Sequence, residues 1–171
     1  HKQAKAKKAT GIDGVTKEKY EENLDENLKN LVDRMKRQAY KPQEVRRVYI
    51  PKDGSKEKRG LGIPAYEDKL VQRIMAKILT AIYEEKFLDV SYGFRPMKSC
   101  HDAIKRLGRI IEKKKVSYIV DMDIKGFFDN VNHEWMIKFL EHDIQDKNFI
   151  RLIKRFLKAG ILEEGKHIET F

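Results

Sequence analysis

Apolar side chains recur every three to four residues over several stretches of the chain, which is the period of an amphipathic helix. Thr16 is a residue type that caps helix N-termini, and the pattern after it predicts a helix over residues 17–38, closed before Pro42. The predicted inward face of this helix comprises Tyr20, Leu24, Leu28, Leu31 and Met35.

The same period predicts four more helices. One spans residues 66–86, with an inward stripe of Leu70, Ile74, Ile78 and Ile82. Another begins after the cap Ser99 and reaches about residue 113, with Ala103, Leu107 and Ile110 or Ile111 turned inward. Asn132 and Asp146 are suitable caps for two helices that end near residues 141 and 158. Residues 88–98, rich in Gly, Pro and aromatics, are predicted to form a loop.

Strand patterns complete the element list. Residues 45–51 and 61–63 flank the turn dipeptide Asp53-Gly54 and predict a β-hairpin. Residues 116–124 predict the central strand of a helix-covered sheet, with Asp121 and Asp123 on one face. Short strands are expected at 160–162 and 166–168. The fold class is therefore α+β, with a hairpin-and-helix lobe before a second lobe built on the central strand.

Composition limits the classes of protein to which this chain can belong. A hydrophobic fraction of 40% in 171 residues is enough for a packed interior. No apolar run approaches the ~20 residues of a membrane span, and no apolar stretch follows the basic residues 1–8 as in a signal peptide. The single cysteine, Cys100, excludes an internal disulfide, fits a reducing cytosol and is expected to be buried or half-buried. Because the first residue is not Met, we expect a piece of a longer protein.

Charge is distributed unevenly along the chain. Residues 1–120 hold 29 basic and 17 acidic residues, a net charge of +12, whereas residues 121–171 carry −2. A basic body of this kind fits a polyanionic partner such as nucleic acid. An ordinary solvated basic surface fits equally well, so charge alone leaves both interpretations open.

The segment VDMDIKGFFDNVNH, residues 120–133, contains the most specific candidate for a catalytic site. A carboxylate at the end of a central strand can hold Mg²⁺ against a phosphate, because this hard cation prefers oxygen ligands and needs few of them from the protein. Asp123 is the candidate ligand. Asp121 is more simply a solvated carboxylate, and Asp129 is equally suited to capping a turn.

Two basic clusters offer further candidates. The hairpin tip gathers Lys52, Lys56, Lys58 and Arg59, which either close over a triphosphate or keep the tip soluble. The loop SYGFRPMK, residues 91–98, interleaves aromatics with cations, as in single-strand nucleic-acid binding. Here we expect Phe94 in the core and Arg95 at the functional surface.

These segments, in this order, resemble the reverse transcriptases encoded by bacterial group II introns, which are also intron maturases. The resemblance lies in ATGIDGVT (9–16), QAYKPQEVRRVYIPKDG (38–54), RGLGIP (59–64), EDKLVQ (67–72), YGFRPMKSCHDAI (92–104) and VDMDIKGFFDNVNH (120–133). Mild departures are Gly60 where the family commonly has Pro, Met97-Lys98 where it has Gly-Arg, and Lys69 where it has Arg.

The resemblance implies an RNA-directed DNA polymerase with right-hand architecture. Residues 1–15 would be a basic arm, 16–115 the fingers, and 116–171 part of the palm with a partial antiparallel sheet. Implied partners are group II intron RNA, an RNA template with its DNA primer, and dNTP, with no membrane. A homodimer is left open, and the implied location is the bacterial cytoplasm.

The resemblance also implies roles for individual residues. Asp123 and the backbone carbonyl of Ile124 would hold catalytic Mg²⁺, and Phe128 would exclude a sugar 2′-hydroxyl by its bulk. The implied triphosphate contacts are Lys52 and Arg59. The implied nucleic-acid contacts are Arg46, Arg47, Arg95 and Lys98.

The family's later motifs, which supply its other catalytic carboxylates, are not found in these residues. We therefore expect this chain by itself to be inactive. Two alternatives stay open: an RNA-binding splicing cofactor without polymerase chemistry, and a related bacterial reverse transcriptase from a defence or diversity-generating system.

Overall fold

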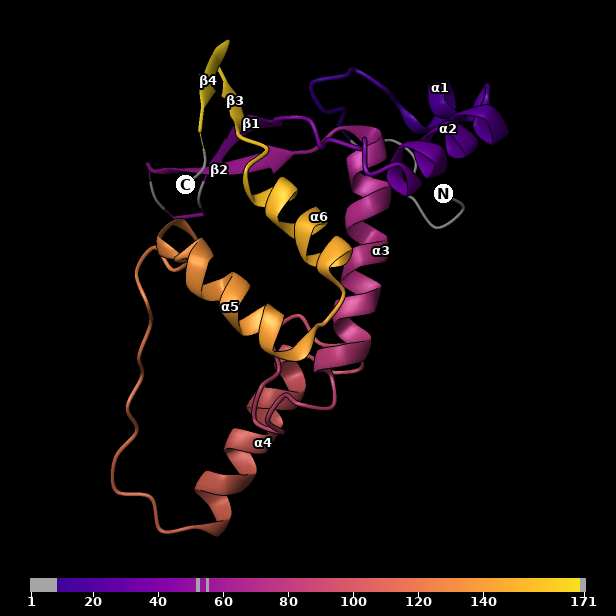
Figure 1. Ribbon diagram of the computed structural model, residues 1–171. Coiled ribbons are helices and arrows are strands. Elements are labelled where there is room, and N and C mark those ends of the chain that lie inside the picture. The colour runs from indigo at the N-terminus through magenta and orange to yellow at the C-terminus, as the bar shows by residue number, and fades with distance from the viewer. Residues whose placement is uncertain (1–8, 52, 55, 170–171) are drawn as a thin grey trace. The chain divides into compact units, whose positions relative to one another are not determined.

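The computed structural model describes residues 9–51, 53–54 and 56–169 (Figure 1). They form a mixed α+β fold. The helices are α1 (Lys17–Glu21), α2 (Leu24–Lys36), α3 (Tyr66–Tyr83), α4 (Cys100–Lys113), the short 3₁₀ helix η1 (Phe128–Asn130), α5 (His133–Asp143) and α6 (Lys147–Leu157). The strands are β1 (Val45–Pro51), β2 (Lys58–Ile63), β3 (Ile161–Glu163) and β4 (Lys166–Ile168).

The chain divides into two compact units. One comprises the chain up to Arg73 together with the chain from Val131 onward, and the other is Ile74–Asn130. α3 begins in the first unit and ends in the second. No helix among the described residues has the length and apolar character needed to cross a membrane.

The sheet of the first unit has the strand order β2-β1-β3-β4 (Figure 1). β1 and β2 form the predicted antiparallel hairpin, in which Val48 faces Leu61. The predicted C-terminal strands are confirmed as the hairpin β3–β4, and β3 pairs in parallel with the start of β1. The sheet is therefore mixed, and it joins the two hairpins from opposite ends of the sequence.

The predicted helix over residues 17–38 is divided into α1 and α2. At the break, Asn27 Nδ2 donates to the carbonyl oxygen of Tyr20 at 3.0 Å and so satisfies an acceptor at the end of α1. The apolar face is confirmed: Tyr20 and Leu31 are buried. Tyr20 packs on Tyr66 with ring centroids 4.9 Å apart, and Leu24 and Leu28 pack against the same cluster.

All four predicted helix caps are confirmed. The side chains of Thr16, Ser99, Asn132 and Asp146 each accept a backbone N–H in the first turn of their helix. Because a cap satisfies N–H groups that lack a partner within the helix, it fixes where the helix begins.

The predicted inward stripes of α3 and α4 are partly wrong. Leu70 is buried, but Ile74 and Ile78 further along α3 are exposed. On α4, Leu107 is 50% exposed, and Ile110 and Ile111 are exposed as well. The amphipathic patterns are real, but no described residue of the second unit covers these faces.

The predicted central strand over residues 116–124 is also wrong. This segment is extended, without strand pairing in the part of the chain that the structure describes, and Figure 1 shows it as an open stretch between α4 and η1. A strand requires a hydrogen-bonded neighbour. The partial antiparallel palm sheet expected around this segment is therefore not formed among the described residues.

Candidate functional site

The segment ATGIDGVT, residues 9–16, lies against the start of α3. Gly11 is buried, and a side chain there would place its Cβ 2.5 Å from the carbonyl oxygen of Pro64 and 2.6 Å from Cα of Ala65. Only glycine permits this close approach of two backbones. Asp13 then accepts the backbone N–H of Tyr66, the first residue of α3, at 3.0 Å.

The charged residues of the EDKLVQ segment bind other parts of the first unit. Glu67 accepts from the Tyr20 hydroxyl at 3.1 Å and from the Arg34 guanidinium at 2.5 Å. Lys69 donates to the carbonyl oxygen of Ala9 at 2.7 Å. These contacts join α1, α2 and the N-terminal segment to α3. The sequence shows the EDKLVQ motif but not these contacts, because their partners lie far away along the chain.

Asp68 is the buried member of this set, at 2% exposure. It accepts a hydrogen bond from the Tyr40 hydroxyl and another from the backbone N–H of Gln43 at 2.9 Å. Burial raises the pKa of Asp68 above its usual value, while these two hydrogen bonds work in the opposite direction. Asp68 thus fixes the chain that enters β1.

The cations of the β1–β2 hairpin differ in what they contact. Arg46 donates twice to the carbonyl oxygen of Thr10, at 2.6 and 3.1 Å. Arg47 pairs with Glu163 of β3 at 3.5 Å. Arg59 lies exposed on β2, opposite Ile50, whereas Lys52 lies outside the described residues.

Glu163 also accepts a hydrogen bond from the hydroxyl of Tyr49, which is the main reason that the pKa of Tyr49 is raised. Two side chains of β1 therefore meet one carboxylate of β3, where backbone pairing covers only two residues of each strand. This carboxylate links the N-terminal hairpin to the C-terminal one.

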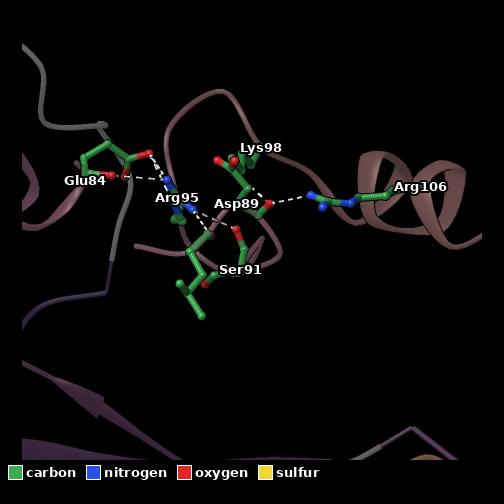
Figure 2. Close-up of polar contacts among 7 residues, drawn as sticks. Glu84, Asp89, Ser91, Arg95, Lys98 and Arg106 are labelled. Atoms are coloured by element: carbon green, nitrogen blue, oxygen red, sulfur yellow. Dashed lines mark hydrogen bonds and ion pairs between the residues drawn. The ribbon is translucent and has the colours of Figure 1, made fainter. Parts of the chain in front are cut away.

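In the second unit, Arg95 organises the loop after α3 (Figure 2). Its side chain is only 7% exposed and forms an ion pair with Glu84 at 2.8 Å. The guanidinium also donates to the carbonyl oxygens of Glu84, Leu88 and Ser91 at 3.2, 2.8 and 3.0 Å. One buried arginine thereby satisfies carbonyls along the whole turn. Its predicted contact with nucleic acid stays a prediction.

A second pair of cations holds the same loop from the other side (Figure 2). Lys98 and Arg106 both donate to the carbonyl oxygen of Asp89, at 3.1 and 3.0 Å. Phe94, expected in the core, is fully exposed and has a left-handed backbone with φ of 58°. The reason is that its neighbour Arg95 takes the inward position. Cys100 is likewise exposed rather than buried.

Asp123, the predicted metal ligand, lies in the open segment after α4. Its side chain and that of Asp121 are exposed, and Ile124 is 69% exposed. Among the described residues there is no group of three His, Cys, Asp or Glu side chains placed to hold a metal ion. The oxygen donors of Asp123 suit Mg²⁺, which keeps several waters and takes only one or two carboxylates from a protein.

A tight turn connects Asp123 to Phe128. Gly126 has a left-handed backbone with φ of 63°, and its carbonyl oxygen accepts from Asn130 Nδ2 at 2.7 Å. Phe128 begins η1 and is 81% exposed, with the ring of Phe127 set edge-on at a centroid distance of 5.4 Å. Gly126 and Asn130, which close this turn, carry no signal in the sequence that would single them out.

A family model described as reverse transcriptase (RNA-dependent DNA polymerase) matches residues 50–171. The chain belongs to the reverse transcriptase family. The matched range contains Arg59, Arg95, Lys98, Asp123 and Phe128, whereas Arg46 and Arg47 precede it. Members of this family generally use Mg²⁺.

Individual relatives of this reverse transcriptase domain come from bacteria, fungi and plants. The chain is 44% identical to the group II intron-encoded protein LtrA of Lactococcus lactis over 147 residues, which are 86% of this chain and 24% of LtrA. It is 36% identical to the protein YkfC of Escherichia coli over 91% of this chain and 41% of YkfC. It is 30% identical to nuclear intron maturase 2 of Arabidopsis thaliana, over 61% of this chain and 15% of that protein.

The chain thus spans about a quarter of the length of LtrA. Its relatives include group II intron-encoded and maturase proteins, in agreement with the resemblance seen in the motifs.

Proposed function

We propose that residues 1–171 supply the fingers and the first part of the palm of an RNA-directed DNA polymerase encoded by a group II intron. The observation that carries this proposal is the family match over residues 50–171, which includes the aspartate segment 120–133. The proposed partners are intron RNA, an RNA template with a DNA primer, and dNTP.

The proposed chemistry is attack of a primer 3′-hydroxyl on the α-phosphorus of a dNTP, with release of pyrophosphate. Asp123 and the carbonyl oxygen of Ile124 would hold Mg²⁺, which supplies charge stabilisation for the attacking and leaving oxygens. The exposed ring of Phe128 would fill the space beside the sugar 2′ position and disfavour ribonucleotides. Arg59 and Lys52 would neutralise the triphosphate.

Other predicted roles belong to the same proposal. Arg46, Arg47, Arg95 and Lys98 would contact nucleic acid, although Arg46 and Arg95 already donate to backbone carbonyls of the chain. With a single aspartate at the expected catalytic position, this chain alone should not extend a primer.

Primer extension on an RNA template by the full-length protein that contains these residues tests the proposal. We expect extension that requires dNTP and a divalent cation. Tight binding of intron RNA without any extension would instead indicate a splicing cofactor that retains the fold without the chemistry. Extension by the 171-residue chain alone would contradict the expected inactivity.

A further inference from the structure

The face of α4 that carries Arg106, Arg109 and Lys113 presents a row of cations. Their spacing of three and four residues places them on one side of the helix, with axial steps of about 4.5 and 6 Å. Arg106 is engaged with the loop through Asp89. The row continues at the end of the helix with Lys114, which is exposed.

This row borders a shallow hollow of about 480 Å³ within the second unit. The hollow has one carboxylate, Asp102, which accepts from the backbone N–H and the hydroxyl of Ser99 in a capping box. The hydrogen bond from Ser99 lowers the pKa of Asp102. This carboxylate therefore faces the helix N-terminus and does not neutralise Arg109, Lys113 and Lys114.

In the part of the chain that the structure describes, basic side chains of helix α6 have partners within the fold, unlike those at the end of α4. Arg155 donates to the carbonyl oxygen of Tyr40 at 2.6 Å, and Lys154 pairs with Glu141 at 2.8 Å. By contrast, Lys113 and Lys114 have no ion pair within the ranges that the structure describes. Among the residues that the structure describes, the guanidinium of Arg109 donates only through Nε, to the carbonyl oxygen of Lys105 in its own helix.

We propose that Arg109, Lys113 and Lys114 form a contact surface for the phosphodiester backbone of RNA. The axial step of about 6 Å between Arg109 and Lys113 is of the same order as the spacing of consecutive phosphates along a strand, and Lys114 adds a charge at the helix end. Arg offers a fork for phosphate oxygens and Lys a point charge, and neither reads a base here, so binding is independent of sequence. This inference rests on the proposed function and adds a surface distinct from Arg46, Arg47, Arg95 and Lys98.

The test measures binding of a fluorescently labelled single-stranded RNA to the 171-residue chain by anisotropy over a range of salt concentrations. The test variant is Arg109→Gln/Lys113→Gln/Lys114→Gln. Each phosphate contact contributes about 0.7 to the salt slope for a single strand, so the slope should fall by about 2. A fourfold rise in salt then costs the wild type roughly 15 to 20 times more affinity than it costs this variant.

Two control variants distinguish the effect of charge on α4 from a loss of charge elsewhere and from a change of side chain at the same positions. Lys147→Gln/Lys158→Gln/Lys166→Gln removes the same charge from exposed positions in the first unit and should leave the slope within one unit of wild type. Arg109→Lys/Lys113→Arg/Lys114→Arg keeps the charge on α4 and should retain the wild-type slope. Thermal unfolding followed by circular dichroism identifies any variant that has lost its structure.

Equal slopes for the α4 variant and the first-unit control variant would overturn the proposal. Tighter binding to phosphatidylserine vesicles than to RNA, lost in the α4 variant, would also overturn it, in favour of a membrane surface. If the wild type binds no RNA at all, the RNA-binding part of the proposed function fails as well. Failure of primer extension alone leaves the α4 surface standing and refutes only the polymerase chemistry.

Discussion

Two glycines, Gly11 in the first unit and Gly108 in the second, differ in the space around their α-carbons. Gly11 has no space for a Cβ, because the carbonyl oxygen of Pro64 would lie 2.5 Å away. Gly108, inside α4, has nothing within 4 Å of the position that a Cβ would take. Close backbone packing therefore requires glycine at position 11, whereas the space around position 108 would admit a larger side chain.

Gly11→Ala should lower the free energy of unfolding by about 1–3 kcal/mol, because the backbone must shift to admit the methyl group. Gly108→Ala should raise it by about 0.5–1 kcal/mol, because alanine loses less conformational entropy in a helix. Urea denaturation of both variants checks the pair. A neutral Gly11→Ala would contradict the close contact between residue 11 and the start of α3.

The buried Asp68 carboxylate predicts a dependence of stability on pH. Burial raises its folded-state pKa, so the folded protein holds the proton more tightly than the unfolded chain does. Stability should therefore fall as pH rises from the usual aspartate range through the raised pKa. Tyr40→Phe removes a donor that opposes this shift, raises the pKa of Asp68 further, and leaves the carboxylate less satisfied.

We expect Tyr40→Phe to cost about 1.5–3 kcal/mol at about pH 7 and clearly less near pH 4, where Asp68 gains a proton. The matched control is Tyr20→Phe, since Glu67 keeps its Arg34 partner after that change. Urea denaturation at the two pH values gives the comparison. A loss for Tyr40→Phe that does not change with pH would show that Asp68 is not the group responsible.

At the scale of elements, local signals predicted the helices well. Caps such as Ser99 and Asp146 depend only on neighbouring residues, and the hairpin depends on its turn, so the sequence carries the needed information. The burial of a side chain is harder to predict, because it depends on which residues from distant parts of the chain pack against it. For this reason the inward stripe of α4, the core position of Phe94 and the buried Cys100 were predicted wrongly.

The cap of α6 offers a direct check of this local logic. Asp146 accepts the backbone N–H groups of Asn148 and Phe149 at 2.8 and 3.1 Å. Asp146→Ala should lower stability by about 1 kcal/mol, while Asp146→Asn, which keeps an acceptor oxygen, should lose only part of that. Thermal unfolding measures both. Equal losses for the two variants would mean that the cap hydrogen bonds contribute little.

At the scale of the whole molecule, the open segment 116–124 is the main departure from the predicted fold. Its apolar side chains are exposed, with Tyr118 at 90% and Val120 at 75%. Unpaired backbone beside exposed apolar side chains favours association with another strand. The candidate site lies in this segment. The sequence predicts candidate residues for it, and this assignment stays a prediction, while their mutual geometry depends on how this segment pairs, which local sequence does not encode.

We therefore expect the 171-residue chain to self-associate, and Val120→Lys to weaken that association. Val90→Lys is the matched control, because Val90 is similarly exposed, at 61%, but lies in the loop after α3. Sedimentation velocity over a range of concentrations measures the effect. A wild-type chain that stays monomeric throughout that range would contradict this expectation.

The most direct test of the central proposal compares Asp121→Asn with Asp123→Asn in the full-length protein, by primer extension on an RNA template. The two exposed aspartates lie two residues apart and undergo the same chemical change, so the comparison isolates metal ligation from charge and folding. We predict that Asp123→Asn abolishes extension while Asp121→Asn retains most of it. Equal activity of the two variants would contradict the assignment of Asp123 as the catalytic metal ligand.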